Sequence, residues 1–107
     1  MTNITFYVKS DNTIAGFKSK GHAEFSRRGT DIVCASVSIL LINTINSIEK
    51  LTGDRCSYKI NDRRATIDFE MDNTGDKSQV LLASLKMGLE GIAGEYPGNV
   101  TIKIEEV

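Results

Sequence analysis

The chain has 107 residues, of which 40% are hydrophobic and 25% are charged, and its formal net charge at pH 7 is -1. These values are typical of one globular domain, here residues 1–107, that buries a core without disulfides or metals. The near-neutral charge gives no general electrostatic attraction to nucleic acid or to a membrane surface, so we expect neither as a partner.

The sequence contains no segment typical of membrane insertion or export. No apolar run approaches the roughly 20 residues that cross a bilayer, and the N-terminus lacks the basic and apolar regions of a signal peptide. We therefore expect a cytoplasmic protein, in which Cys34 and Cys56 stay reduced and form no disulfide. Two cysteines and one histidine are too few for a structural zinc site, so we expect neither a metal nor a cofactor.

Residues 4–21 predict a β-hairpin. Apolar and polar side chains alternate from Ile4 to Ser10, and a second strand-like stretch follows the polar residues Asp11 and Asn12. A two-residue turn at Asp11 and Asn12 sets a register in which apolar side chains face each other: Phe6 opposite Phe17, and Val8 opposite Ala15.

Residues 31–51 predict a long amphipathic helix. Thr30 and Asp31 are both suitable N-terminal residues, and Gly53 follows as a stop signal. Because β-branched residues are frequent in this segment, burial of its apolar face must stabilise it more than helix propensity does. We expect that face to contain Val33, Val37, Leu40, Leu41, Thr44, Ile48 and Leu51.

The second half of the chain predicts another hairpin, another helix and a last strand. In the hairpin at residues 56–70, Asp62 and Arg63 form the tip, Asp68 and Glu70 face solvent, and the cross-strand pairs are Ile60 with Ala65 and Tyr58 with Ile67. The helix at residues 74–96 buries Val80, Leu81, Leu85, Gly88 and Ile92, and the strand at residues 100–104 buries Val100, Ile102 and Ile104. The row of Gly88, Gly91 and Gly94 is typical of close approach to another backbone, whether the sheet, the first helix or a second subunit.

The predicted order of elements is therefore ββαββαβ. Hairpins favour a mostly antiparallel sheet, and both helices need its apolar face for burial. We expect an α+β fold of the two-layer sandwich type, with about five strands covered by two helices.

The segment between the first hairpin and the first helix contains residues that suit nucleophilic catalysis. His22 stands at the end of a predicted strand and Cys34 in the first turn of the predicted helix. Only the loop 23–29 joins the strand to the helix, so the two residues can lie close in space. A helix N-terminus favours a thiolate and offers N–H groups to an oxyanion, and an imidazole can act as the base. Gly21 and Gly29 bracket the loop and can act as its hinges. On pattern alone, a surface histidine and a small buried cysteine explain the same residues.

The block from Gly21 to Ser38 resembles a bacterial family, the ribosomal-processing cysteine proteases called Prp. It reads GHA, then a short loop containing glycine, then GTDIVCASVS, and the similarity continues through the middle hairpin, the last helix and the last strand. This resemblance implies a cysteine endopeptidase in which Cys34 is the nucleophile and His22 is the general base and acid. It also implies a homodimer and a loop that moves when substrate binds. The implied substrate is a precursor of large-subunit ribosomal protein number twenty-seven, whose N-terminal extension is removed by a cut after an aromatic motif.

Two further residues of the block can support the site. Asp31 either orients His22 or caps the helix. Ser38 lies four residues after Cys34, where its hydroxyl either bonds near the sulfur or bonds back to a helix carbonyl. Cys56 begins a predicted strand and has no second histidine to pair with, so we expect it to be inert packing.

Two interpretations without catalysis stay open at this point. One is a ribosome- or RNA-associated α+β module, which steep salt-dependent RNA binding would reveal and which would use the outward side chains Thr5, Tyr7, Lys9, Lys18 and Lys20. The other is a scaffold that dimerises through its glycine row, in which Cys34 would react with iodoacetamide as slowly as an ordinary thiol.

Overall fold

A computed structural model describes residues 1–21 and 30–107, with Thr30 and Asp31 as backbone only. The described residues form five strands and two helices in the predicted order ββαββαβ: β1 (Thr2–Val8), β2 (Ile14–Lys20), α1 (Thr30–Leu51), β3 (Cys56–Asn61), β4 (Thr66–Met71), α2 (Asp76–Glu95) and β5 (Val100–Glu106). The strands make one sheet in the order β3-β4-β2-β1-β5, in which β5 pairs parallel to β1 and the other neighbours are antiparallel.

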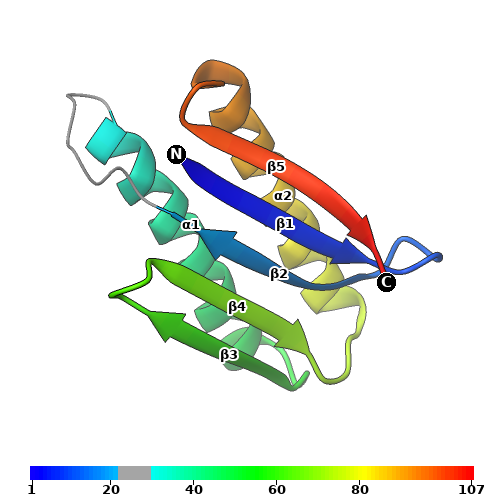
Figure 1. Cartoon of the computed structure of the whole chain (residues 1–107). Coiled ribbons are helices and arrows are strands. Elements are labelled where there is room, and N and C mark those ends of the chain that lie inside the picture. Colours follow the sequence, from blue (N-terminus) through cyan, green and yellow to red (C-terminus); the bar gives the residue numbers. More distant parts are fainter. Residues whose placement is uncertain (22–29) are drawn as a thin grey trace.

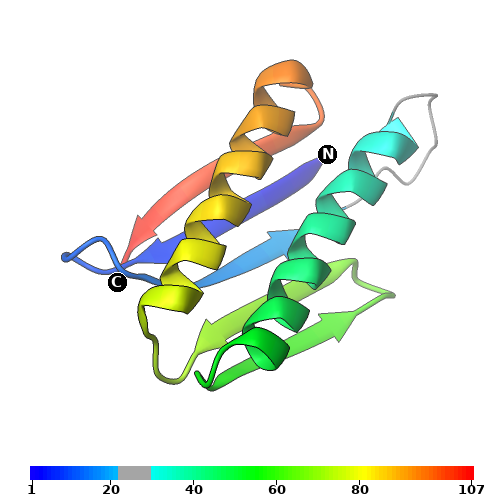
Figure 2. The same ribbon diagram turned by 180° about the vertical axis from the view of Figure 1, so that it is seen from behind.

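Both helices lie side by side on one face of this sheet and run in opposite directions (Figures 1 and 2). Among the described residues, no helix covers the opposite face. The expected two-layer α+β sandwich is therefore confirmed, and the face between the layers holds the hydrophobic core. Its most buried large side chains are Phe6, Phe17, Ile4, Leu41, Ile45, Ile48, Leu82 and Leu89.

The register of the first hairpin is confirmed in its middle and wrong at its turn. Phe6 pairs with Phe17 as predicted, but Val8 pairs with Ile14 instead of Ala15. The turn is longer than two residues, because the Lys9 N–H bonds to the Thr13 carbonyl. Ala15 is then an extra residue that has no partner in β1, which is the geometry of a β-bulge.

The second hairpin is shifted by two residues from its predicted register. Ile60 pairs with Ile67 rather than Ala65, and Tyr58 pairs with Phe69. The loop at 62–65 is again longer than expected, and Ala65 adopts a left-handed conformation with φ 52°. A shift of two residues leaves every side chain on the same face, so the alternation of inward and outward residues in the sequence still holds.

The buried face of α1 matches the prediction except at its end. Leu51 is 69% exposed because the last turn extends past the core, while Ile45, which the periodicity did not include, is buried. In α2 the prediction for Val80 is wrong, since its side chain is 67% exposed. The core positions of that helix are Ser78, Leu82, Leu85 and Leu89, which recur at steps of three and four residues on one face. In β5, an edge strand, Val100 is buried but Ile104 is 49% exposed.

We expected no apolar segment long enough to cross a membrane, but part of α1 meets that criterion by length and composition. By length and mean hydropathy, 1.6 over its apolar window, the part Ile32–Leu51 is sufficient to cross a membrane. In the fold, however, one face of this helix packs on the sheet through Val33, Val37, Leu41, Ile45 and Ile48. Burial in the core accounts for the apolar side chains on that face, whereas Ile32 and Ile39 on the outer face are exposed.

The glycine row of α2 has one close contact. A Cβ at Gly88 would lie 3.4 Å from Leu40 Cδ1 of α1, so this glycine permits the two helices to approach. A Cβ at Gly91 or Gly94 would meet no atom within 4 Å among the described residues. The row therefore does not contact the sheet, and only its first member contacts α1.

Candidate active site

Cys34 lies on α1 at a pocket of about 320 Å³. Its side chain is half-buried. Because α1 begins at Thr30, Cys34 is the fifth helical residue and stands at the start of the second turn, one residue deeper than the predicted start at residue 31 implies. Helical side chains tilt toward the N-terminus, so the sulfur still leans toward the first turn, whose N–H groups have no partner within the helix.

The pocket lies between the first half of α1 and the tip of the β3–β4 hairpin. Val37 and Ile67 are buried and form its apolar floor, while Ile42 and Ile60 are 39% and 43% exposed and form its rim. The remaining lining residues are Thr2, Ser19, Gly21, Ser38, Asn61, Asp62, Ala65 and Thr66. A thiol at one end of an apolar cavity can meet a peptide whose neighbouring side chain fills that cavity.

Gly21 lines the same pocket and is held in a conformation that favours glycine. Its φ is 102°, in the left-handed region, and a Cβ there would collide with the Met1 carbonyl oxygen. Its N–H donates to the Ala65 carbonyl at 3.0 Å. The residue bonded to His22 is therefore anchored beside Cys34, between the start of β1 and the start of β4.

Thr2 is a site residue that the sequence did not reveal. Its side chain is 3% exposed, and its Oγ1 donates to the Gly21 carbonyl at 3.3 Å. The same oxygen lies 3.8 Å from Cys34 Sγ, within hydrogen-bonding distance for sulfur. No local motif signals this contact, because Thr2 and Cys34 are 32 residues apart and only the sheet order brings them together.

The other predicted site residues are placed only in part. His22 and Gly29 lie outside the described residues, and Asp31 is described only as the second backbone position of α1. Ser38 lines the pocket on the same side of the helix as Cys34, as predicted. The roles assigned to these residues stay predictions.

The environment of Cys56 disfavours the thiolate that a cysteine nucleophile needs. It is half-buried against the core at the start of β3. Burial, and then the nearby carboxylates of Glu49 and Asp72, raise the pKa of its thiol above the usual value. The neutral thiol is favoured, which supports the prediction of inert packing.

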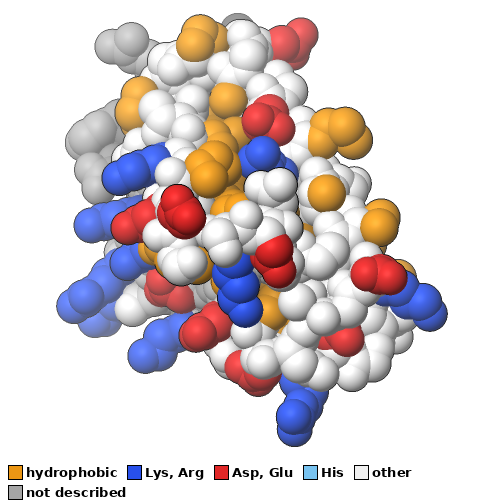
Figure 3. Space-filling view, turned by 90° about the vertical axis from the view of Figure 1, so that its right-hand side faces the viewer, with side chains coloured by type: hydrophobic (Ala, Val, Ile, Leu, Met, Phe, Trp, Pro, Cys, Tyr) orange, Lys and Arg blue, Asp and Glu red, His pale blue; other side chains and the backbone are white. Residues whose placement is uncertain are grey.

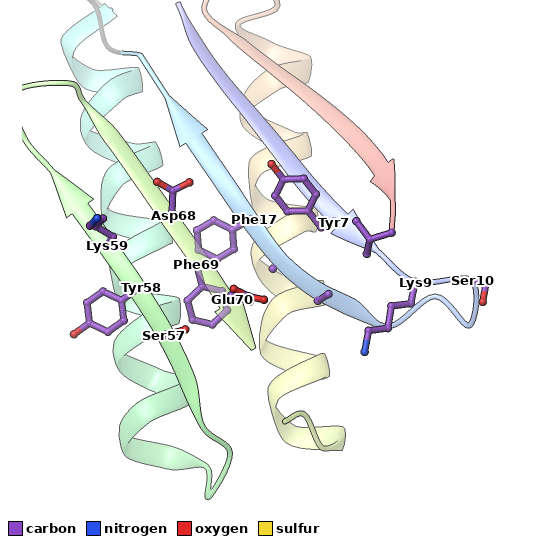
Figure 4. Close-up of a pocket in the computed structure, with 13 residues that line it drawn as sticks. Tyr7, Lys9, Ser10, Phe17, Ser57, Tyr58, Lys59, Asp68, Phe69 and Glu70 are labelled. Carbon is purple, nitrogen blue, oxygen red and sulfur yellow. The ribbon is translucent and has the colours of Figure 1, made fainter. Parts of the chain in front are cut away.

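A larger hollow of about 860 Å³ lies on the open face of the sheet (Figure 4). It contains none of the predicted catalytic residues. The bulge on β2 puts the small residues Ala15 and Gly16 on this face beside Tyr7, and the charged side chains around it have both signs. Lys18, one of the outward lysines, has its Nζ 3.9 Å from an Asp68 oxygen. Figure 3 shows both acidic and basic side chains on the side of the molecule next to β5, with several Lys and Arg side chains along one edge of the view.

Within the described part of the chain, no group of three or more His, Cys, Asp and Glu side chains is arranged to hold a metal ion. The polar groups that line the pocket are the Cys34 thiol, the hydroxyl groups of Thr2, Ser19, Ser38 and Thr66, the Asn61 carboxamide and the Asp62 carboxylate.

Comparison with known proteins agrees with this geometry. The family model described as Cysteine protease Prp matches residues 1–101. The ribosomal processing cysteine protease Prp of Bacillus subtilis is 28% identical over an alignment of 107 positions, which covers 95% of this chain and 96% of that protein. The crystal structure of the essential ribosomal processing protease Prp from S. aureus with a substrate peptide superposes with a TM-score of 0.91 at 25% identity, over 98% of this chain and 100% of that chain. The structure of the same S. aureus protease with a covalently linked product peptide gives 0.89 at 26% identity, with the same coverage.

Proposed function

Because this chain belongs to the Prp family of cysteine proteases, we propose that it removes the N-terminal extension from a precursor of large-subunit ribosomal protein number twenty-seven, cutting after an aromatic motif. The observation that carries the proposal is the position of Cys34, half-buried at an apolar pocket that it shares with the residue bonded to His22. The S. aureus relative has been crystallised with a substrate peptide and with a covalently linked product peptide, which supports covalent catalysis in the family.

The proposed reaction follows the residues around the sulfur. His22 takes the proton of Cys34, and the thiolate attacks the scissile carbonyl carbon to form a tetrahedral oxyanion. Amide N–H groups at the start of α1 donate hydrogen bonds to that oxyanion. His22 then protonates the leaving amine, and water hydrolyses the acyl-enzyme and regenerates the thiol.

The pocket supports selection of an aromatic side chain. Its volume is at the lower end of the range for ligand sites, which suits one or two side chains rather than a long peptide segment. Ile42 and Ile60 present apolar surface at the rim, where an aromatic ring would gain free energy by leaving water. An extended peptide with its scissile bond at Cys34 would place the preceding side chains against this rim.

Incubation with the extended precursor, followed by mass spectrometry, tests the assignment. The intact enzyme and Cys56→Ala should both make a single cut after the aromatic motif, whereas Cys34→Ala and His22→Ala should make none while retaining a normal circular dichroism spectrum. Turnover by folded Cys34→Ala would exclude it as the nucleophile. An uncut precursor with the folded, unmodified enzyme would leave the substrate assignment wrong.

We further propose that the protein acts as a homodimer in the cytoplasm. Residues 32–48 of α1 include no charged side chain, and apolar side chains are exposed on the outer faces of both helices: Ile32 (68%), Ile39 (67%), Val80 (67%) and Met87 (70%). The uncharged outer face of α1 suits a second copy of the same face. A reducing compartment keeps a thiol nucleophile active, which supports the cytoplasm as its location.

A further inference from the structure

Thr2 links the two segments that the proposed reaction needs. It occupies the start of β1, directly beside the end of β2, and its hydroxyl lies between the Gly21 carbonyl at 3.3 Å and Cys34 Sγ at 3.8 Å. A hydroxyl has one proton to donate and two lone pairs to accept with. With a neutral thiol it can donate to the carbonyl and accept from the S–H. With a thiolate, which has no proton, it can interact favourably with the sulfur only by donating.

We infer that the Thr2 hydroxyl turns from the Gly21 carbonyl to the Cys34 sulfur as the thiolate forms, and so stabilises the nucleophile. The inference rests on the proposed function, in which Cys34 is the nucleophile. It adds a third residue to the reaction of Cys34 and His22. The proton that leaves the thiol still goes to the imidazole, and the hydroxyl changes only its hydrogen-bond partner.

The backbone around Thr2 holds this hydroxyl in place. The Thr2 N–H donates to the Asn99 carbonyl at 2.8 Å, and Thr2 pairs with Val100 in the parallel ladder between β1 and β5. Gly21 is fixed in turn by its bond to Ala65. The rotation of one C–O bond is therefore enough to change partners, and no backbone movement is required.

Burial makes the hydroxyl effective at this point. The Thr2 side chain is 3% exposed, so little water competes for the hydrogen bond to sulfur. A hydrogen bond to a charged acceptor is about twice as strong as one between neutral groups, so this bond strengthens when the thiol ionises. The alternative is that the hydroxyl only satisfies its own hydrogen-bonding need through the Gly21 carbonyl, in which case it affects stability but not the sulfur.

Isosteric substitution separates these two roles. Thr2→Val keeps the branched shape and removes the hydroxyl, while Thr2→Ser keeps the hydroxyl and loses one methyl group. Thr44→Val is the matched control, since Thr44 is also buried but its hydroxyl donates to the Leu40 carbonyl instead. All variants carry Cys56→Ala, so that iodoacetamide reports on a single thiol.

The measured quantity is the rate of Cys34 alkylation as a function of pH, without substrate. We expect Thr2→Val to react about tenfold more slowly near pH 7 and to reach its full rate at a higher pH, because a charge-assisted hydrogen bond is lost. Thr2→Ser and Thr44→Val should follow the unsubstituted profile within about twofold. Thr2→Ala provides a second hydroxyl-free variant if the valine variant does not fold. The pH profile of kcat/KM for the precursor should shift in the same direction.

A Thr2→Val profile that superposes on the parent profile, in a folded protein, would overturn the inference. If the parent cleaves the precursor and Thr2→Val is unchanged in both assays, this inference fails and the proposed function stands. If the parent does not cleave the precursor, the alkylation profiles still decide what the hydroxyl does to the sulfur.

Discussion

Replacing Gly21 by alanine should destabilise the protein strongly, although it adds one methyl group. Gly21 has φ 102°, and an L-residue in such a conformation costs about 1–3 kcal/mol. The new Cβ would also collide with the Met1 carbonyl oxygen, so the start of β1 must move, at a cost of about 1–2 kcal/mol for a crowded site. Together these effects predict a loss of about 2–5 kcal/mol in the free energy of unfolding.

The contrasting substitution is Gly91→Ala on α2. A Cβ at Gly91 meets no atom within 4 Å in the described part of the chain, and alanine is the better helix former by about 1 kcal/mol. The same chemical change should therefore stabilise the protein at one position and destabilise it at the other. Urea unfolding followed by circular dichroism measures both free energies, and the midpoint of thermal unfolding should fall by about 10–20 °C for Gly21→Ala.

The cleavage assay adds a second readout for Gly21→Ala. Because Gly21 is bonded to His22 and lines the pocket of Cys34, precursor cleavage should fall even at a temperature where the variant is fully folded. A free energy of unfolding within 0.5 kcal/mol of the parent protein, roughly the effect of a neutral surface substitution, would refute the strain argument.

Three further predictions follow from other parts of the fold. The Asp54 carboxylate accepts hydrogen bonds from the Ser78 hydroxyl and from the Gly75 N–H, and these bonds, the one from Ser78 most, lower its pKa below 3.8. Asp54 therefore stabilises the fold above that pH, and the stabilisation is lost as the pH falls through the lowered pKa. Urea unfolding of Asp54→Asn from pH 2 to pH 6 should show a smaller dependence on pH than the parent. Ile60→Asp should raise KM for a precursor with the aromatic motif but leave Cys34 alkylation unchanged, as kinetics and alkylation rates will show. Ile39→Glu should convert a dimer to a monomer in light scattering, because it places a charge on the uncharged outer face of α1.

Periodicity predicted the elements of this fold well, because burial of one face is a property of the local sequence. The order ββαββαβ, the length of α1 and the pairing of Phe6 with Phe17 all followed from alternation and helical spacing. The pairing near both turns did not, since it depends on loop hydrogen bonds such as the one from Lys9 to Thr13. The prediction for Val80 was wrong because α2 packs through the face that carries Ser78, Leu82, Leu85 and Leu89, and Val80 does not lie on that face.

The candidate site was predictable only where its residues are close in sequence. Cys34 and Ser38 share one side of α1, and helical spacing alone places them together at the pocket. Thr2 and Ile60 reach the same pocket from β1 and β3, which no local pattern connects to α1. Their contributions depend on the order of strands in the sheet, which hairpin signals do not specify.

The buried and the exposed walls of the pocket affect different properties: the buried walls affect stability, and the exposed walls affect substrate selectivity. Its floor, Val37 and Ile67, belongs to the hydrophobic core, so truncation there creates a cavity and costs about 1–5 kcal/mol in a domain with little stability to lose. Its rim, Ile42 and Ile60, is more than one-third exposed and supports little else in the fold. Substitutions at the rim can therefore change which peptide fits beside Cys34 while the protein stays folded, whereas substitutions at the floor reduce activity by reducing the folded population.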